Sequence, residues 1–289
     1  MTNRKIKKIV DGNWVMEGAG VKLRRIFGYG DTDLTNPFLL LDNFDSSRPE
    51  DYLAGFPWHP HRGIETITYL IEGIVEHTDS LGNSGTINSG EVQWMTAGSG
   101  IVHQEMPKVY DGTMRGFQLW ANLPKKHKMT LPRYRDIRAD EIPEVKQDGY
   151  NVKVICGDYA GVSGPAKDIV IQPWFFDVKA KPGAEFTLEA RPEDNVLVCV
   201  FEGKGFFDKE RTVEVGPGQL AVLEDGDALA CSAGPEGVRF LLMAAKPINE
   251  TVAWRGSIVM NTEYELKTAY REYKAGTFIK KSGFTPPSI

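Results

Sequence analysis

Two short pairs of residues in this chain have the types and spacing of metal ligands. His59 and His61 are two positions apart in WHPHRGIET, and His103 and Glu105 have the same spacing in GSGIVHQEM. Alternate side chains of a β-strand point to the same face, so each pair would present both side chains together. Two such strands facing each other would offer three imidazoles and one carboxylate to one ion. Such donors suit Fe(II), Ni, Co, Cu or Zn.

A second carboxylate competes with Glu105 for the fourth position. Glu65 lies four residues after His61, so on an unbroken strand it would share the same face. Gly63 lies between them and could break this alternation. The spacing alone therefore leaves both glutamates open. With either one, four protein ligands around an octahedral ion would leave two positions open, which predicts a reactive centre.

The rest of the sequence is typical of an all-β protein that contains an internal repeat. Short apolar runs alternate with turns that contain glycine or proline. The run TITYLIEG (66–73) is echoed by VLVCVFEG (196–203), and GEVQWMTAGSGIVH (90–103) is echoed by GQLAVLEDGDALAC (218–231). The repeat predicts two similar β-domains in tandem, joined by the polar stretch at 130–150.

We expect the domains to span residues 1–134 and 145–289. The length of 289 residues agrees with two domains, and helical patterning is convincing only near 263–273 (EYELKTAYREY).

The second copy of the repeat lacks the candidate ligands. It carries Glu189 and Arg191 where the first copy has the HPH histidines, and Cys231 and Ala233 where it has His103 and Glu105. An arginine cannot bind a cation, so one metal is predicted, in the N-terminal half.

Composition excludes several classes of protein. A net charge of −5 argues against direct binding of nucleic acid. The sequence shows no secretory signal and no apolar run long enough to cross a bilayer, so no membrane association is expected. The three cysteines are widely spaced and form no C-x-x-C pair, which predicts reduced thiols and a cytoplasmic or nuclear location.

Two further histidines are expected outside the site. His77 lies in the turn-rich EHTDSLGNSG, which predicts a position at the surface or at a pocket rim. His127 lies in KKHK, at the start of a basic stripe (125–138) that is expected to be solvated. The same stripe is the candidate surface for a protein partner.

The candidate residues lie within motifs of a known family. The pattern H-x-H-x3-E-x7-G followed by G-x5-T-A-G-x4-H resembles the paired motifs of cupins, which are double-stranded β-helical (jelly-roll) barrels. The string HPHRGIETITYLIEG…GEVQWMTAGSGIVHQEMP resembles the pirin family, as do PFLLLDNF (37–44), GFQLWANLP (116–124) and IVMNT (258–262). The resemblance covers most of the chain. It implies an all-β fold of two tandem cupin barrels with a short C-terminal helix.

The resemblance also implies the site. In pirins both histidines of HPH and both residues of H-x-E bind one metal, so the implied ligands are His59, His61, His103 and Glu105. Glu105 is thereby favoured over Glu65. Fe(II) is the first expectation for the metal, with Ni, Co, Cu or Zn as alternatives, and no other cofactor is expected.

Two functions follow from this resemblance. Pirins are linked to the 2,3-dioxygenation of quercetin and similar flavonols, so we expect a metal-dependent quercetin 2,3-dioxygenase that uses O2. A metal would lower the pKa of a chelated hydroxyl, and Glu105 would take its proton as the general base. Other pirins resemble redox-responsive regulators of a transcription factor or a metabolic enzyme, which is the alternative. A monomer is expected in either case.

Overall fold

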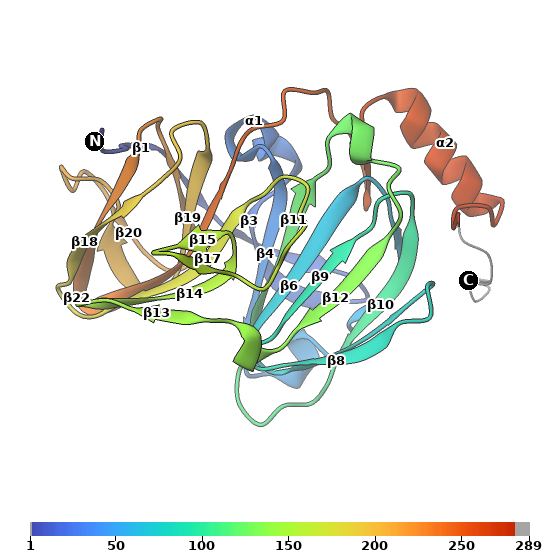
Figure 1. Ribbon diagram of the computed structural model, residues 1–289. Helices are drawn as coiled ribbons and strands as arrows, with labels where there is room; N and C mark the ends of the chain where they lie inside the picture. The colour runs from blue at the N-terminus through green and yellow to red at the C-terminus, as the bar shows by residue number, and fades with distance from the viewer. Residues whose placement is uncertain (1, 281–289) are drawn as a thin grey trace. The chain divides into compact units, whose positions relative to one another are not determined.

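The fold is described for residues 2–280 by a computed structural model, drawn in Figure 1. β-Strands dominate it and a short helix follows near the C-terminus, so the predicted fold class is confirmed. The elements of the first half are β1 (Ile6–Asp11), β2 (Asn13–Glu17), β3 (Val21–Phe27), α1 (Thr32–Thr35), β4 (Phe38–Ser46), β5 (Phe56–His61), β6 (Ile64–Glu72), β7 (Ile74–Asp79), β8 (Ser84–Asn88), β9 (Val92–Thr96), β10 (Ile101–Pro107), β11 (Met114–Asn122) and β12 (Arg133–Ile137).

The elements of the second half continue the same pattern. They are β13 (Glu144–Lys146), β14 (Tyr150–Cys156), β15 (Asp158–Tyr159), β16 (Val162–Ser163), β17 (Trp174–Ala180), β18 (Glu185–Glu189), β19 (Asn195–Phe206), β20 (Glu214–Val215), β21 (Gln219–Leu223), β22 (Ala228–Ala245), β23 (Ala253–Arg255), β24 (Ile258–Met260) and α2 (Glu263–Lys274). Single turns of 3-10 helix are η1 (Tyr29–Asp31), η2 (Pro49–Asp51), η3 (Lys125–His127) and η4 (Ala139–Glu141).

Residues 2–280 divide into two compact units that interleave along the chain. The N-barrel unit comprises residues 14–25, 38–139 and 248–280, and the C-barrel unit comprises residues 2–13, 26–37 and 140–247. Strand β1 thus belongs to the C-barrel unit, where it pairs with β21, and α2 belongs to the N-barrel unit. The expected spans 1–134 and 145–289 assign the N-terminal residues to the first domain and the C-terminal residues to the second. The compact units differ, because residues 2–13 belong to the C-barrel unit and residues 248–280 belong to the N-barrel unit.

The internal repeat in the sequence corresponds to a repeat of sheet topology. The large sheet of the N-barrel unit has the order β12-β9-β6-β11-β4-β3-β2, and that of the C-barrel unit has the order β1-β21-β19-β22-β17-β14-β13. Strands β6 and β19, which carry one pair of echoed segments, occupy the same place in the two orders. Strands β9 and β21, which carry the other pair, also match. The edge position that β12 fills in one sheet is filled by β1 in the other.

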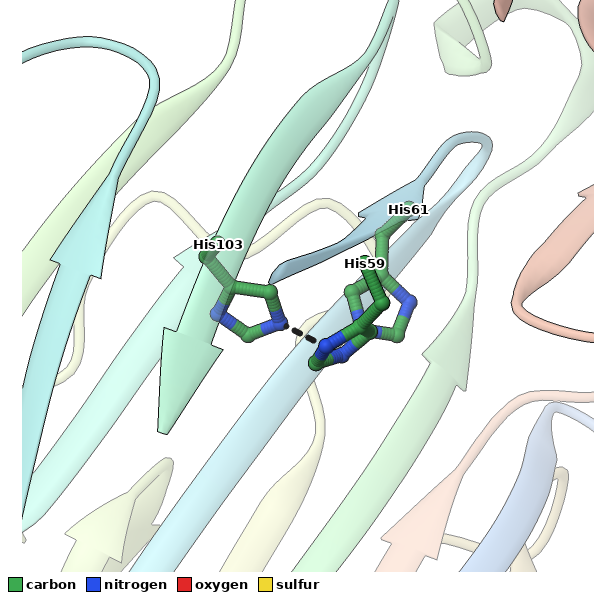
Figure 2. A group of neighbouring side chains, drawn as sticks. All are labelled: His59, His61 and His103. Atoms are coloured by element: carbon green, nitrogen blue, oxygen red, sulfur yellow. Dashed lines mark hydrogen bonds between the residues drawn. The ribbon is translucent and has the colours of Figure 1, made fainter. Parts of the chain in front are cut away.

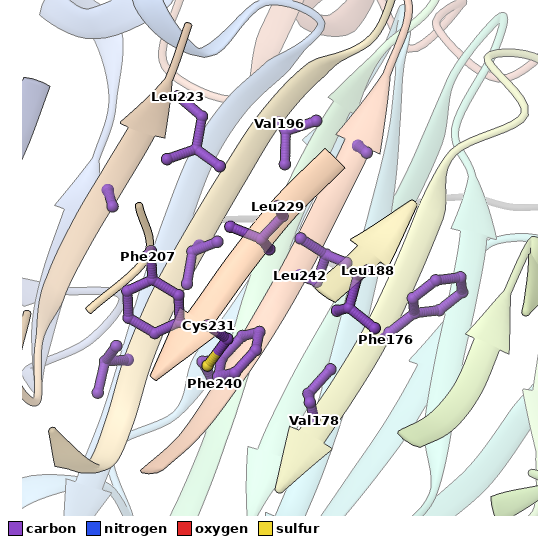
Figure 3. Close-up of a cluster of buried hydrophobic side chains, with 14 of the residues drawn as sticks. Phe176, Val178, Leu188, Val196, Phe207, Leu223, Leu229, Cys231, Phe240 and Leu242 are labelled. Carbon is purple, nitrogen blue, oxygen red and sulfur yellow. The ribbon is translucent and has the colours of Figure 1, made fainter. Parts of the chain in front are cut away.

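The interior of the C-barrel unit is packed with apolar side chains, as Figure 3 shows. Phe207 and Phe240 meet edge to face with ring centroids 4.9 Å apart, and Cys231 lies among them. Burial raises the pKa of the Cys231 thiol. Arg191, which aligns with His61, forms an ion pair of 2.6 Å with Asp194. Apolar packing therefore surrounds Cys231, the counterpart of His103, and an ion pair occupies the counterpart of His61.

The N-barrel unit has a second, smaller sheet with the order β5-β10-β7-β8. Thr68 of β6 donates a hydrogen bond to Glu105 of β10, so the two sheets face each other across the interior. The candidate ligands lie on β5 and β10 of the smaller sheet. Within residues 2–280, the helices are all too short or too polar to cross a bilayer.

Candidate metal centre

Strands β5 and β10 bring three histidines together. They pair antiparallel, with His103 directly opposite His59, and directly opposite residues share a face of a sheet. The two rings have centroids 4.4 Å apart, and their Nε2 atoms are 3.0 Å apart. Figure 2 shows this contact and the ring of His61 beside it. The expected strands therefore do carry these histidines, but as neighbours in one sheet, not as strands that face each other.

His61 completes the cluster from the end of β5. Its Nε2 lies 3.0 Å from Nε2 of His59, and its ring centroid lies 4.9 Å from that of His103. One nitrogen from each of the three rings lies within 4.8 Å of the other two. His61 and His103 are almost wholly buried, so bulk solvent does not reach their rings.

Backbone carbonyls fix the protonation of two of these rings. Nδ1 of His59 lies 2.8 Å from the carbonyl oxygen of Pro57, and Nδ1 of His61 lies 3.1 Å from that of Ser257. A carbonyl oxygen only accepts, so each Nδ1 carries the proton and donates it. Each Nε2 therefore bears a lone pair that points into the cluster.

This arrangement fits a bound cation. Two lone pairs at 3.0 Å repel each other unless a positive charge lies between them. Protonation is opposed, because burial lowers the pKa of all three imidazoles. Two metal–nitrogen bonds of about 2.1 Å at a right angle would separate their nitrogens by about 3.0 Å. The cluster thus has the donors, protonation state and spacing of a site for a divalent metal.

Glu105 lies on β10 two residues after His103 and is largely buried. Its Oε1 accepts a hydrogen bond of 2.9 Å from the hydroxyl of Thr68. Its negative charge favours the protonated form of His59. Among the residues described, the closest group contains only the three histidines. The assignment of Glu105 as fourth ligand therefore stays a prediction, as does the complete ligand set.

Glu65 points away from this cluster. Strand β5 ends at His61, and Gly63 turns the chain into β6 with a φ of +78°. Glu65 lies directly opposite Thr96, accepts a hydrogen bond of 2.7 Å from its hydroxyl, and is completely buried. Thr68, at a position of opposite parity on β6, faces Glu105. Burial raises the pKa of Glu65, which favours the neutral acid in a structural role.

The expectation of an exposed or rim position for His77 is wrong. This residue is buried on β7, directly opposite Glu105, and its ring centroid is 5.3 Å from that of His103. It stacks on Tyr134 with centroids 4.7 Å apart, and its Nε2 is 3.4 Å from Asp79. The alternation in IVEHTD could have predicted this strand, but the turn-forming residues after it obscured the pattern.

The basic stripe is also not uniformly solvated. Lys128 is 2% exposed, and its Nζ donates to the carbonyl oxygens of Gly63 and Val259 at 2.9 and 3.0 Å. A third bond of 2.7 Å reaches Oδ1 of Asn122. Burial lowers the pKa of Lys128 to about 7. Lys128 therefore joins the turn at Gly63, which follows the HPH strand, to Asn122 and to the segment around Val259.

Polar side chains form a row on the sheet that faces Glu105. Asp42, Gln118, Thr68 and Gln93 lie directly opposite one another on four neighbouring strands. The Thr68 hydroxyl lies 2.6 Å from Oε1 of Gln118 and 2.9 Å from Oε1 of Glu105. It has a single proton, so it donates to one of these two oxygens at a time. The row supplies hydrogen-bonding groups next to the cluster, and sequence patterning did not single it out.

An aromatic pair also lies next to His61. The ring of Trp120 meets that of His61 at 87°, with centroids 5.1 Å apart. Trp254 lies next to Trp120 with centroids 5.9 Å apart. A hydrogen-bonding row and an aromatic pair thus both border the histidine cluster.

Comparisons with known proteins agree with this fold. The pirin family model matches residues 20–121, and the model of the pirin C-terminal cupin domain matches residues 175–279. The chain is 42% identical to a pirin-like protein of Caulobacter vibrioides over 280 residues, which cover 96% of this chain and all of that one. It is 36% identical to pirin of Homo sapiens over 274 residues, covering 93% and 90% of the two chains.

A solved structure of quercetin 2,3-dioxygenase from Acinetobacter baumannii is similar to the whole fold. It superposes with a TM-score of 0.88 at 33% sequence identity, covering 96% of this chain and 99% of that one. Family models match both repeats, and relatives align over nearly the full length. The chain therefore belongs to the pirin family.

Proposed function

We propose that the protein is a metal-dependent dioxygenase of flavonols such as quercetin. The ligands in this proposal are His59, His61, His103 and Glu105, with Fe(II) as the first choice of metal. The observation that carries the proposal is the convergence of three imidazoles, those of His61 and His103 buried and that of His59 half-buried, two of which have their lone pairs directed inward by backbone carbonyls. The similarity to a quercetin 2,3-dioxygenase over nearly the whole chain supports the choice of reaction.

The surroundings of the cluster suit a flat molecule with several hydroxyl groups. When bound, the metal would accept adjacent hydroxyl and carbonyl oxygens of the substrate and lower the pKa of that hydroxyl. Glu105 would take the hydroxyl proton as general base, and Thr68 would hold its carboxylate in place. Trp120 would pack against an aromatic ring, and the amides of Gln93 and Gln118 would bond outer hydroxyls.

Oxygen consumption with quercetin tests the proposal. Protein freed of metal is reloaded with Fe(II), Ni, Co, Cu or Zn, and uptake of O2 is followed together with loss of the flavonol absorbance. At least one loaded form should turn over, and His61→Ala should abolish both metal binding and turnover. Turnover by metal-free protein, or by His61→Ala, would refute the proposed site.

A regulatory function is the second candidate, and a basic surface favours it. Arg255 and three exposed cations of α2, Lys267, Arg271 and Lys274, line a shallow cavity of about 440 Å³ beside Tyr270. Such a surface fits an acidic protein partner. It suits this role better than the stripe at 125–138, in which Lys128 is buried. Absence of turnover with every metal, together with saturable binding of an acidic peptide that Lys267→Glu and Arg271→Glu weaken, would favour regulation.

A further inference from the structure

A segment distant in sequence packs against the strand that carries two of the histidines. Residues 253–279, here called the strap, contain β23, β24 and α2, drawn in red in Figure 1. Arg62, which directly follows the HPH strand, forms a parallel bridge with Ile258. The amide of Val259 donates a hydrogen bond of 3.0 Å to the carbonyl oxygen of Arg62.

The strap contacts His61 itself. Nδ1 of His61 donates to the backbone carbonyl of Ser257 at 3.1 Å. The hydroxyl of Ser257 in turn donates to the carbonyl oxygen of Pro60, inside the HPH motif. His61 is 1% exposed, so bulk solvent does not reach its ring to replace this partner. The position of the strap therefore sets both the tautomer and the tilt of this imidazole.

Arg62 provides a second anchor for the strap. It is 2% exposed, and its Nη1 lies 2.7 Å from a carboxylate oxygen of Glu272 on α2. Its Nη2 donates to the carbonyl oxygen of Phe278 at 2.9 Å, and the guanidinium lies 4.2 Å from the centre of the Phe278 ring. Gly100 leaves room for this ring, because a Cβ there would lie 2.9 Å from it.

We propose that Ser257 and Arg62 are positioning residues for the metal, because they dock the strap that orients His61. Mutation of the groups that orient a metal-bound histidine typically lowers metal affinity about 10- to 100-fold. Binding linkage is reciprocal, so a metal that binds better when the strap is docked must also hold the strap in place by the same factor. Metal binding at the histidines would then hold α2 more firmly in place, and with it the basic surface that α2 carries. This inference rests on the proposed function only in that a metal binds at the histidines.

Titration with Ni²⁺ alone tests the coupling in one direction. The double variant Ser257→Ala/Glu272→Ala removes one hydroxyl and one carboxylate that tie the strap to the HPH strand. The matched control is Tyr270→Phe/Glu263→Ala, which also removes one hydroxyl and one carboxylate, but ones whose partners lie within the strap. The Tyr270 hydroxyl donates to the carbonyl oxygen of Arg255, and the Glu263 carboxylate lies 3.9 Å from the guanidinium of the same residue. We expect Ni²⁺ affinity to fall about tenfold or more in the first variant and to remain within about twofold of wild type in the second.

Hydrogen exchange of the wild-type chain tests the reverse direction and needs no variant. Ni²⁺ should slow exchange of strap amides, including Val259, more than exchange of strand β19 in the C-barrel unit, which serves as the reference. Equal Ni²⁺ affinities in the two double variants, or equal slowing in the strap and in β19, would overturn the inference. If the wild-type chain does not bind any of the metals tested, the proposed function itself fails, which is a different result.

Discussion

Replacing Gly63 by alanine should destabilise the N-barrel unit, because the turn after the HPH strand has no room for a side chain. Gly63 has a φ of +78°, and a Cβ there would lie 1.9 Å from the carbonyl oxygen of Val259. The left-handed conformation costs alanine about 1–2 kcal/mol. Relieving the overlap with a backbone atom adds about 1–3 kcal/mol. We therefore expect Gly63→Ala to lower the free energy of unfolding by about 2–5 kcal/mol.

Gly82→Ala is the matched control. Gly82 also has a positive φ, +88°, but no atom lies within 4 Å of the position that a Cβ would take, so only the conformational cost of about 1–2 kcal/mol applies. Alanine restricts the unfolded chain equally at both sites, so this effect cancels in the comparison. Urea unfolding of the two variants measures the difference directly. Equal losses of stability would show that the strap can move away from Gly63 without cost, which would refute the close packing described here.

Three other predictions concern the surroundings of the site. Thr68→Val should weaken Ni²⁺ binding about tenfold, because Glu105 loses the hydroxyl that donates to its Oε1. Thr68→Ser keeps the hydroxyl and should retain wild-type affinity. Equal Ni²⁺ affinities of the valine and serine variants would contradict this role. The pKa of Lys128 falls from 10.5 to about 7 on folding, so the unfolded chain binds more protons between these values and stability should rise with pH across that window. Urea unfolding between pH 7 and pH 9 should show this rise in wild type and a smaller one in Lys128→Met. The three cysteine thiols are buried, so they should react with a thiol reagent only after unfolding, and rapid reaction of the folded chain would contradict their burial.

Local spacing predicted much of the site, because strand alternation acts over two residues. The pairs His59/His61 and His103/Glu105 each lie on a strand, as their spacing indicated. The same rule could not tell which strands are neighbours, since pairing depends on the whole sheet. It therefore predicted strands that face each other, where the structure has β5 and β10 side by side.

The remaining features of the site depend on contacts between distant segments. The partner of His61 is Ser257, 196 residues later in the chain, and no local pattern marks a backbone carbonyl as an acceptor. Lys128 appeared as one of a run of cations, and only the three oxygens around its Nζ show that it is buried. The two-barrel architecture was more accessible, because both copies of the repeat preserve their apolar strands in the same order.

The interleaving of the chain ends has a consequence for biosynthesis. A ribosome that has completed residue 247 has delivered every strand of the C-barrel unit, yet the N-barrel unit still lacks residues 248–280. The first repeat to be translated is therefore the last to be completed, in contrast to the usual order for multidomain proteins. Because Ser257 arrives so late, the nascent chain cannot orient His61 fully before its C-terminal segment emerges from the exit tunnel.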